Sequence, residues 1–264
     1  MKEKNEIKNF FKIFGILILS VLVIFITYIS VFVSVPISMK EYKLENNNKE
    51  IIFQEMVHIG ETSFYKDVEE RLKNYRKEGY IYAYEQVKVS NINEAEDLAD
   101  LTGLGVDMYD MISKSAGLDN QKNHMGHIKE SDINADISAA ELILLIKKYK
   151  TDNPHIENME MNVDIKDSLN SLKESGDFTK VIIKAAIRGM LKITLESEEN
   201  MAEGLLNDVI LKERDQVMFD IISNIDSDKI VIHYGALHFK GFFEKLKETD
   251  SSWKIVKETE IEAF

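Results

Sequence analysis

Two histidines stand at the ends of apolar runs, where an imidazole could act in catalysis or bind a metal ion. His58 closes the run that begins at Ile51, and His238 follows the β-branched run 230–232. A neutral imidazole is a common general base and a common ligand of divalent metals. In an α/β domain, sites assemble at the carboxyl ends of strands, where residues far apart in sequence converge. We therefore expect His58 and His238 to share one site.

Two carboxylates and one arginine could complete that site. Glu85 ends the apolar and aromatic run 80–84, and Glu55 stands three residues before His58. Burying a carboxylate is costly unless it is paired, so Glu85 either has a cation or metal partner or lies at an exposed strand end. Arg214 is either a solvated helix residue or the cation that holds a developing oxyanion. Two histidines and a carboxylate suit metal-assisted hydrolysis.

The other histidines give weaker signals. His233 lies inside a strand and is expected to be structural. His124 and His127 have the spacing of a metal pair on a helix, but Gly126 between them favours a loop. We expect the site to form elsewhere.

The N-terminal region predicts a membrane anchor. Residues 13–37 carry no charge and exceed the roughly 20 apolar residues that a membrane-spanning helix needs. A cleaved signal peptide is the alternative, but its apolar core is shorter and ends at a small-residue site. Four lysines in residues 1–12 place that short segment in the cytoplasm by the positive-inside tendency, although lysines also follow the span. We expect a single-pass protein of the cell membrane with an extracytoplasmic domain.

Composition narrows the possible partners. Residues 38–50 are polar and read as a tether, or as a structured first turn of the domain at 51–264. Four Lys and two Glu give residues 1–12 a charge of +2, so the rest carries −13 − (+2) = −15. A domain with this much negative charge is a poor candidate for binding nucleic acid, whose phosphates are also negative. The absence of cysteine excludes thiol nucleophiles, thiolate metal sites and disulfides.

Periodicity along the chain predicts alternating strands and helices. The expected strands are 51–57, 80–89, 131–137 and 229–234, with a final edge strand at 253–263. The expected helices are 61–79, 93–116, 138–149, 205–222 and 242–247, the third opening with a capping box at Ser138 and Glu141. Residues around 151–200 read as a helical insertion. This order predicts an α/β fold with a mainly parallel central sheet flanked by helices.

Taken together, these motifs resemble the TraB/TIKI family of the erythromycin esterase/ChaN-like superfamily. That family has an early Gly-x-x-His, a Glu closing the next strand, an Arg on a late helix and a late Gly-x-x-His followed by Gly. The matching stretches are Glu55-Met56-Val57-His58, Tyr84-Glu85, Asn134-Ala135-Asp136, Glu213-Arg214-Asp215 and Gly235-Ala236-Leu237-His238 with Gly241. Glu55 stands where Gly is expected, as in erythromycin esterases.

The resemblance implies a hydrolase-like site. His58 and His238 would bind a divalent metal such as Mn²⁺ or Zn²⁺, with Glu85 or Glu55 completing the shell or acting as base. Arg214 would stabilise the transition state. The implied protein is a membrane-tethered metallopeptidase acting on an extracytoplasmic peptide or small ligand. A non-catalytic protein that sequesters or senses a peptide signal is the alternative, and a scaffold with structural histidines is a third.

Overall fold

The computed structural model describes residues 36–102, 108–152 and 211–264, together with Ser20, Thr27, Ala185, Ala186, Arg188 and Gly189. Apart from Ser20, Thr27 and its last two residues, the predicted membrane span at 13–37 lies outside the described residues, as does most of the insertion predicted around 151–200. In the described part of the chain, no helix is both long and apolar enough to cross a bilayer.

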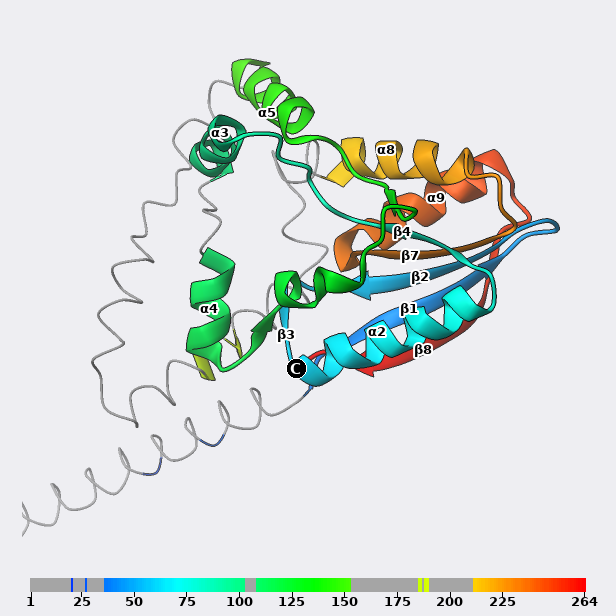
Figure 1. Cartoon of the computed structure of the whole chain (residues 1–264), viewed down its shortest axis with the longest axis horizontal. Helices are drawn as coiled ribbons and strands as arrows, with labels where there is room; N and C mark the ends of the chain where they lie inside the picture. Colours follow the sequence, from blue (N-terminus) through cyan, green and yellow to red (C-terminus); the bar gives the residue numbers. More distant parts are fainter. Residues whose placement is uncertain are drawn as a thin grey trace, which may run out of the picture.

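A six-stranded sheet forms the centre of the domain (Figure 1), with strand order β6-β4-β7-β2-β1-β8. Its strands are β1 (Ser38–Glu45), β2 (Glu50–Met56), β4 (Ile81–Tyr84), β6 (Ile133–Asn134), β7 (Lys229–Gly235) and β8 (Lys254–Glu262). The pairs β6–β4, β4–β7 and β7–β2 are parallel, whereas β2–β1 and β1–β8 are antiparallel. The predicted α/β class, the mostly parallel sheet and the C-terminal edge strand are confirmed.

Helix α2 (Thr62–Lys77) covers one face of this sheet, and α8 (Lys212–Ser223) and α9 (Phe239–Thr249) cover the other. The helices α3 (Ile92–Thr102), α4 (Met108–Ala116) and α5 (Ala139–Asp152) lie beyond the ends of the strands (Figure 1). Two 3₁₀ turns are η1 (Gln121–His127) and η4 (Ala236–His238). A short pair, β3 (Ile59–Gly60) with β5 (Asp119–Asn120), stands beside the main sheet. The helix predicted at 93–116 corresponds to α3 and α4, and that predicted at 205–222 is described only from 211 onward.

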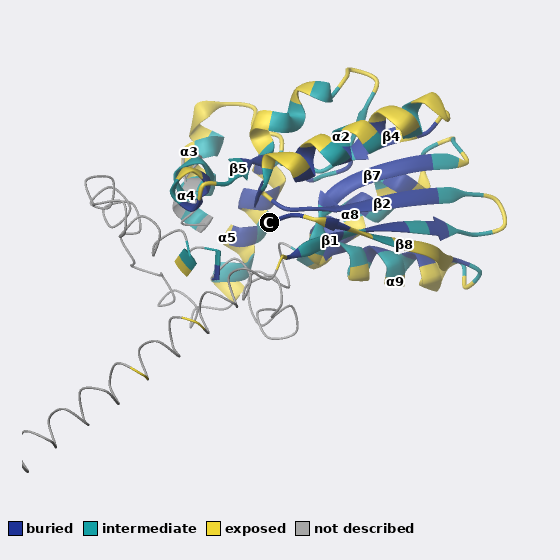
Figure 2. Cartoon of the chain, turned by 90° about the horizontal axis from the view of Figure 1, so that it is seen from below, coloured by how far each residue is buried: buried dark blue, intermediate teal, exposed yellow. Residues whose placement is uncertain are grey.

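Alternation along β2 shows how the two faces are filled. Phe53 points to the face where Met218 of α8 and Phe242 of α9 are buried, while Ile52 packs on the opposite face with Leu72 of α2. Successive side chains of a strand point to opposite faces, so a strand buried on both faces reads as a continuous apolar run. Figure 2 shows the inner strands buried and the outer sides of α2 and α9 exposed.

The tether predicted at 38–50 is wrong, because Ser38–Glu45 forms β1 within the sheet. Its apolar residues Met39, Tyr42 and Leu44 are buried, whereas lysines and glutamates between them made the stretch look like a linker. The strand also closes the domain, since Ile37 exchanges backbone hydrogen bonds with Ala263 and Phe264 near the C-terminus. Met39 is buried on the α2 face of the sheet and Tyr42 and Leu44 on the α8–α9 face, so burial on both faces, not overall polarity, decides this element.

Local signals for helix ends were reliable. The capping box that opens α5 is present, because the Glu141 carboxylate accepts from the Ser138 N–H at 3.0 Å and the Glu141 N–H donates to the Ser138 hydroxyl at 3.3 Å. Gly79, the last residue of the helix predicted at 61–79, has φ +88° just after α2, a conformation that glycine adopts without steric cost.

Replacing Met39 tests the corrected assignment of β1. We expect Met39→Ala in the full chain to lower the free energy of unfolding by about 2–5 kcal/mol, the cost of truncating a buried methionine. Val256→Ala is the matched control, because Val256 on the neighbouring strand is 40 % exposed. Urea unfolding followed by circular dichroism measures both. If both variants left the free energy of unfolding nearly unchanged, the result would contradict the assignment of β1 and favour a tether at 38–50.

Candidate functional site

Polar side chains follow each of the four parallel strands at the same edge of the sheet. Asp136 comes after β6, Glu85 after β4, His238 after β7 and His58 after β2. Because α8 leads into β7 and runs antiparallel to it, the first turn of α8 returns to this same edge, bringing Arg214 with it. The strand-end convergence expected from the sequence is therefore present.

Arg214 is the buried cation of this edge. Its Nε donates to Asp136 Oδ1 at 2.9 Å and its Nη2 to Asp136 Oδ2 at 2.8 Å, while Nη2 also donates to Glu85 Oε1. Its side chain is 9 % exposed, and those of Glu85 and Asp136 are 8 % and 0 % exposed. Burial alone would lower the pKa of the guanidinium, but the two carboxylates raise it well above its usual value.

Glu85 is held as a carboxylate. Its Oε2 accepts the backbone N–H of Gly235 at 2.6 Å. Burial favours the protonated acid, but attraction by Arg214, by His238 and by His58, together with that N–H, outweighs burial and lowers the pKa of Glu85 to about 2. A carboxylate with so low a pKa is a weak general base near neutral pH. The alternative of an exposed, unpaired strand end does not apply to Glu85.

His238 forms a buried pair with Asp215. Its Nδ1 lies 2.6 Å from Asp215 Oδ1, and its ring stands edge-on to Tyr234 at 4.7 Å between centroids. A carboxylate can only accept, so Nδ1 carries the proton and the other nitrogen, Nε2, presents a lone pair while the ring is neutral. Asp215 follows Arg214 directly in the first turn of α8. Two consecutive residues of this helix therefore bind different parts of the site, Arg214 the carboxylates and Asp215 the imidazole of His238.

The two glycines around His238 are needed for space. Neither Gly235 nor Gly241 has a positive φ, because among the described residues only Gly79 and Gly117 do. A Cβ on Gly235 would lie 3.1 Å from Glu85 Oε2, and a Cβ on Gly241 would overlap Asp215 Oδ2. Both glycines let a carboxylate approach the backbone closely.

His58 stands on the open side of the site. Its ring is exposed, its Nδ1 lies 3.2 Å from Gln121 Oε1, and the ring of Tyr109 is 4.9 Å away between centroids. Both His58 and Tyr109 interact electrostatically with Glu85, and burial and that carboxylate together raise the pKa of Tyr109. The structure therefore brings His58, Glu85, Arg214 and His238 to one edge of the sheet.

Glu55 is placed differently from the other predicted residues. It lies on β2 with its side chain turned toward β1, where Oε2 accepts the Lys40 N–H at 2.8 Å. Glu55 does not take part in the ion pairs of Arg214, which are made with Glu85 and Asp136. The hydrogen bond to β1 accounts for the burial of Glu55 without a catalytic role.

Three residues of the site were missed or undervalued by sequence reasoning. Asp136 and Asp215 stand inside the family-like stretches but were given no role of their own, and Tyr234, whose hydroxyl donates to Asp136 Oδ1 at 3.0 Å, reads as an ordinary strand residue. His233 is buried within β7 as expected. His124 and His127 lie on the turn η1, where His124 contacts Asp119 and His127 contacts Tyr82.

The described residues provide no ready metal shell. Among them, no three histidine or acidic side chains are arranged to hold a metal ion. Both oxygens of Glu85 are also occupied, one by Arg214 and the other by Gly235. The donor set therefore does not fit a divalent ion in this arrangement.

Comparison with known proteins adds no family assignment. No protein-family model, no curated protein and no solved structure matches this chain. The fold and its site define an α/β protein with a charge cluster at the carboxyl edge of its parallel strands.

Substituting Gly241 tests the pair between His238 and Asp215. Alanine is normally favoured over glycine inside a helix by about 1 kcal/mol, yet Gly241→Ala places a methyl group on the Asp215 carboxylate. We expect a lower melting temperature and altered ¹⁵N shifts of the His238 imidazole. Gly126→Ala is the control, because a Cβ there would meet nothing within 4 Å. Unchanged His238 resonances in Gly241→Ala would refute the pairing.

The low pKa of Glu85 predicts acid sensitivity with a definite sign. Because the folded-state pKa falls from 4.5 to about 2, the stabilisation by ionised Glu85 is complete above pH 4.5 and is lost as the pH falls toward 2. Relative to Glu85→Gln, the wild type should lose roughly 3 kcal/mol across that window. Urea unfolding at a series of pH values measures it, with exposed Glu213→Gln as control. Parallel profiles for wild type and Glu85→Gln would contradict the ion pair.

Proposed function

We propose that this chain is a membrane-tethered hydrolase that acts on an extracytoplasmic peptide or small ligand at the carboxyl edge of the sheet. One observation carries the proposal: a buried histidine, His238, is oriented by the carboxylate of Asp215 at 2.6 Å and stands beside the paired carboxylate of Glu85. Such a carboxylate–histidine pair is the arrangement by which proteins prepare an imidazole to accept a proton.

The pair supplies the proton transfers that hydrolysis needs. With Nδ1–H bonded to Asp215, Nε2 of His238 can take a proton from water as its oxygen attacks a carbonyl carbon, and the imidazolium then returns that proton to the leaving group. Asp215 stabilises the imidazolium between the two transfers. The ring carbon Cδ2 of His238 would lie 3.5 Å from a Cβ on Gly235, whose backbone N–H binds Glu85, so the ring stands next to the Glu85 carboxylate.

Glu85 is better suited to fixing the structure around His238 than to acting as a general base. Arg214 is likewise better suited to that structural role than to stabilising an oxyanion. One guanidinium and two carboxylates, those of Glu85 and Asp136, leave the cluster with a net charge of −1, which opposes a developing oxyanion. Its hydrogen bonds instead fix two strand ends and α8 around His238. His58, exposed and close to Glu85, is the second group positioned to touch a substrate.

The family-like motifs support a hydrolase but leave metal use as a prediction. TraB/TIKI-like peptidases would place Mn²⁺ or Zn²⁺ between His58 and His238, and the described residues do not offer a third free donor there. The alternative is a protein that sequesters a peptide signal at the same edge of the sheet. The pairing of Arg214 with Glu85 and Asp136 supports this alternative, because charges that are already paired are less available for catalysis.

Turnover by site variants tests the proposal. Full-length chain is incubated with a library of acetylated peptide amides, with and without Mn²⁺ or Zn²⁺, and products are read by mass spectrometry. We expect His238→Ala to lower the rate by about 10²–10⁴-fold, the usual contribution of a general base. Asp215→Asn should lower kcat with little change in KM, because Asp215 acts on the orientation of His238.

Asp220→Asn is the matched control on the same helix, since Asp220 is exposed. Equal losses in both α8 variants would assign the effect of Asp215→Asn to the helix and not to His238. Peptide binding without turnover in any metal would favour the sequestering alternative. Cleavage that survives in His238→Ala would overturn the proposed base.

A further inference from the structure

The phenol of Tyr109 stands beside the candidate site and takes no part in the proton transfers assigned to His238. Tyr109 lies near the start of α4, and its ring is tilted by 51° against the ring of His58 at 4.9 Å between centroids. The side chain is partly buried, and its hydroxyl forms no hydrogen bond with any of the described residues. A hydrogen-bond donor without a partner is therefore held next to the open side of the site.

Hydrogen bonds from β5 and η1 fix Tyr109 relative to His58. The residue after Tyr109, Asp110, accepts at Oδ1 from the side-chain amide of Asn120 at 2.8 Å. Gln121, which follows Asn120, donates its backbone N–H to the His58 carbonyl at 2.9 Å, and its Oε1 lies 3.2 Å from His58 Nδ1. Two consecutive residues thus bind α4 and His58, so the contact between the two rings is set by the structure around them.

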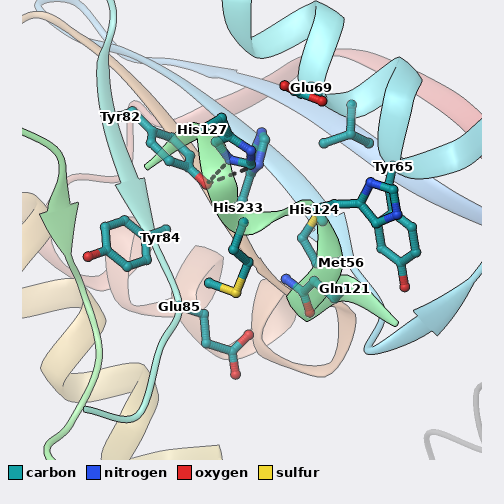
Figure 3. A pocket seen from close by; sticks show the side chains of 12 residues that line it. Met56, Tyr65, Glu69, Tyr82, Tyr84, Glu85, Gln121, His124, His127 and His233 are labelled. Atoms are coloured by element: carbon teal, nitrogen blue, oxygen red, sulfur yellow. Dashed lines mark hydrogen bonds between the residues drawn. The ribbon is translucent and has the colours of Figure 1, made fainter. Parts of the chain in front are cut away.

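The charges of Glu85 and Arg214 act on this phenol. Gln121, which binds His58, lines the same small hollow under α2 as Glu85 (Figure 3), so His58 and its neighbour Tyr109 stand close to that carboxylate. Burial and the charge of Glu85 outweigh the opposite effect of Arg214 and raise the pKa of Tyr109. Near neutral pH the phenol therefore keeps its proton and is a hydrogen-bond donor.

Hydrolysis at this edge needs a donor for the oxyanion. When water attacks a carbonyl carbon, the carbonyl oxygen gains negative charge that positioned donors stabilise. Arg214 is already paired with two carboxylates. The proton of a neutral His58 ring lies on Nδ1, facing Gln121, so its Nε2 cannot donate. The Tyr109 hydroxyl is an uncharged donor at this edge that no carboxylate has engaged.

We infer that Tyr109 is a catalytic residue, whose hydroxyl donates a hydrogen bond to the oxygen of the carbonyl under attack. The water proton passes to Nε2 of His238 as the C–O bond forms, and the Tyr109 proton stays on the phenol. Collapse of the tetrahedral intermediate breaks the bond to the leaving group, which takes the proton from His238. This role rests on the proposed function, whereas the packing of Tyr109 on His58 does not, so the two can fail separately.

Kinetics of Tyr109→Phe test the role. The variant loses a hydroxyl without a partner and keeps the ring, so the full-length chain should melt as the wild type does. With a peptide that the wild type cleaves, we expect kcat to fall by about 10²–10³-fold at nearly constant KM, because the hydrogen bond strengthens in the transition state. A phosphonamidate analogue of that peptide, which mimics the tetrahedral oxyanion, should bind more weakly by a similar factor.

Tyr75→Phe is the matched control. The Tyr75 hydroxyl donates to Glu41 at 2.9 Å near the end of α2, away from the carboxyl edge of the parallel strands. This variant also loses one tyrosine hydroxyl, and its kcat should equal that of the wild type.

NMR of the His58 ring tests the placement of Tyr109 independently of turnover. Tyr109→Leu removes the aromatic ring that stands 4.9 Å from the imidazole. We expect the Cδ2–H and Cε1–H signals of His58 to move in Tyr109→Leu and to stay close to their wild-type positions in Tyr109→Phe. Unchanged signals in Tyr109→Leu would contradict the ring contact and the proposed role with it.

The outcomes separate the phenol from the hydrolysis. Turnover that depends on His238 but is unaltered in Tyr109→Phe would overturn the role of Tyr109 and leave the hydrolase standing. A rise in KM at constant kcat would also overturn it, because the hydroxyl would then bind the ground state. An equal fall of kcat in Tyr75→Phe would do the same, since the loss would not be specific to the site. Absence of turnover in the wild type would refute the hydrolase and the catalytic role together.

Discussion

The buried guanidinium of Arg214 organises the functional edge of this protein. It joins the first turn of α8 to the ends of β4 and β6 through Glu85 and Asp136. A buried charge pair is costly to desolvate and is retained only where its hydrogen bonds are satisfied. Here two hydrogen bonds reach Asp136, one reaches Glu85, and the Gly235 N–H satisfies the other oxygen of Glu85. Removing one partner would leave the others charged and buried.

The ion pairs of Arg214 also determine how His238 is oriented. Arg214 fixes the rotation of α8 about its axis, and the next residue, Asp215, then points at His238. Gly241 allows the Asp215 carboxylate to rest against α9, which makes the α8–α9 contact part of the site. Orientation of the imidazole is therefore a consequence of helix packing and is not achieved by local sequence around His238 alone.

The amino-acid sequence predicted the fold class because continuous β-branched runs and amphipathic stretches reflect burial directly. The strand β7 and the capping box of α5 are examples. Residues 38–45 were assigned to a tether because the buried residues Met39, Tyr42 and Leu44 are divided between the two faces and are separated by lysines and glutamates, so no simple alternation marks the strand. His58, Glu85, Arg214 and His238 were predictable as strand-end or motif residues, whereas Asp215 and Tyr234 depend on which helix face meets which strand. Such tertiary choices leave no local pattern.

The two faces of the sheet carry different polar groups at the carboxyl edge of the parallel strands. On the α8–α9 side, Asp215 orients the imidazole of His238, while on the α2 side the Tyr82 hydroxyl lies 3.3 Å from ring nitrogens of both His127 and His233. Glu85 stands between the two sides, because it faces the side chains under α2 and pairs with Arg214 of α8. Its carboxylate is held by Arg214 and by the Gly235 N–H, so its position beside His238 is fixed. Fixed positioning of this kind is how a folded protein lowers the entropic part of a reaction barrier.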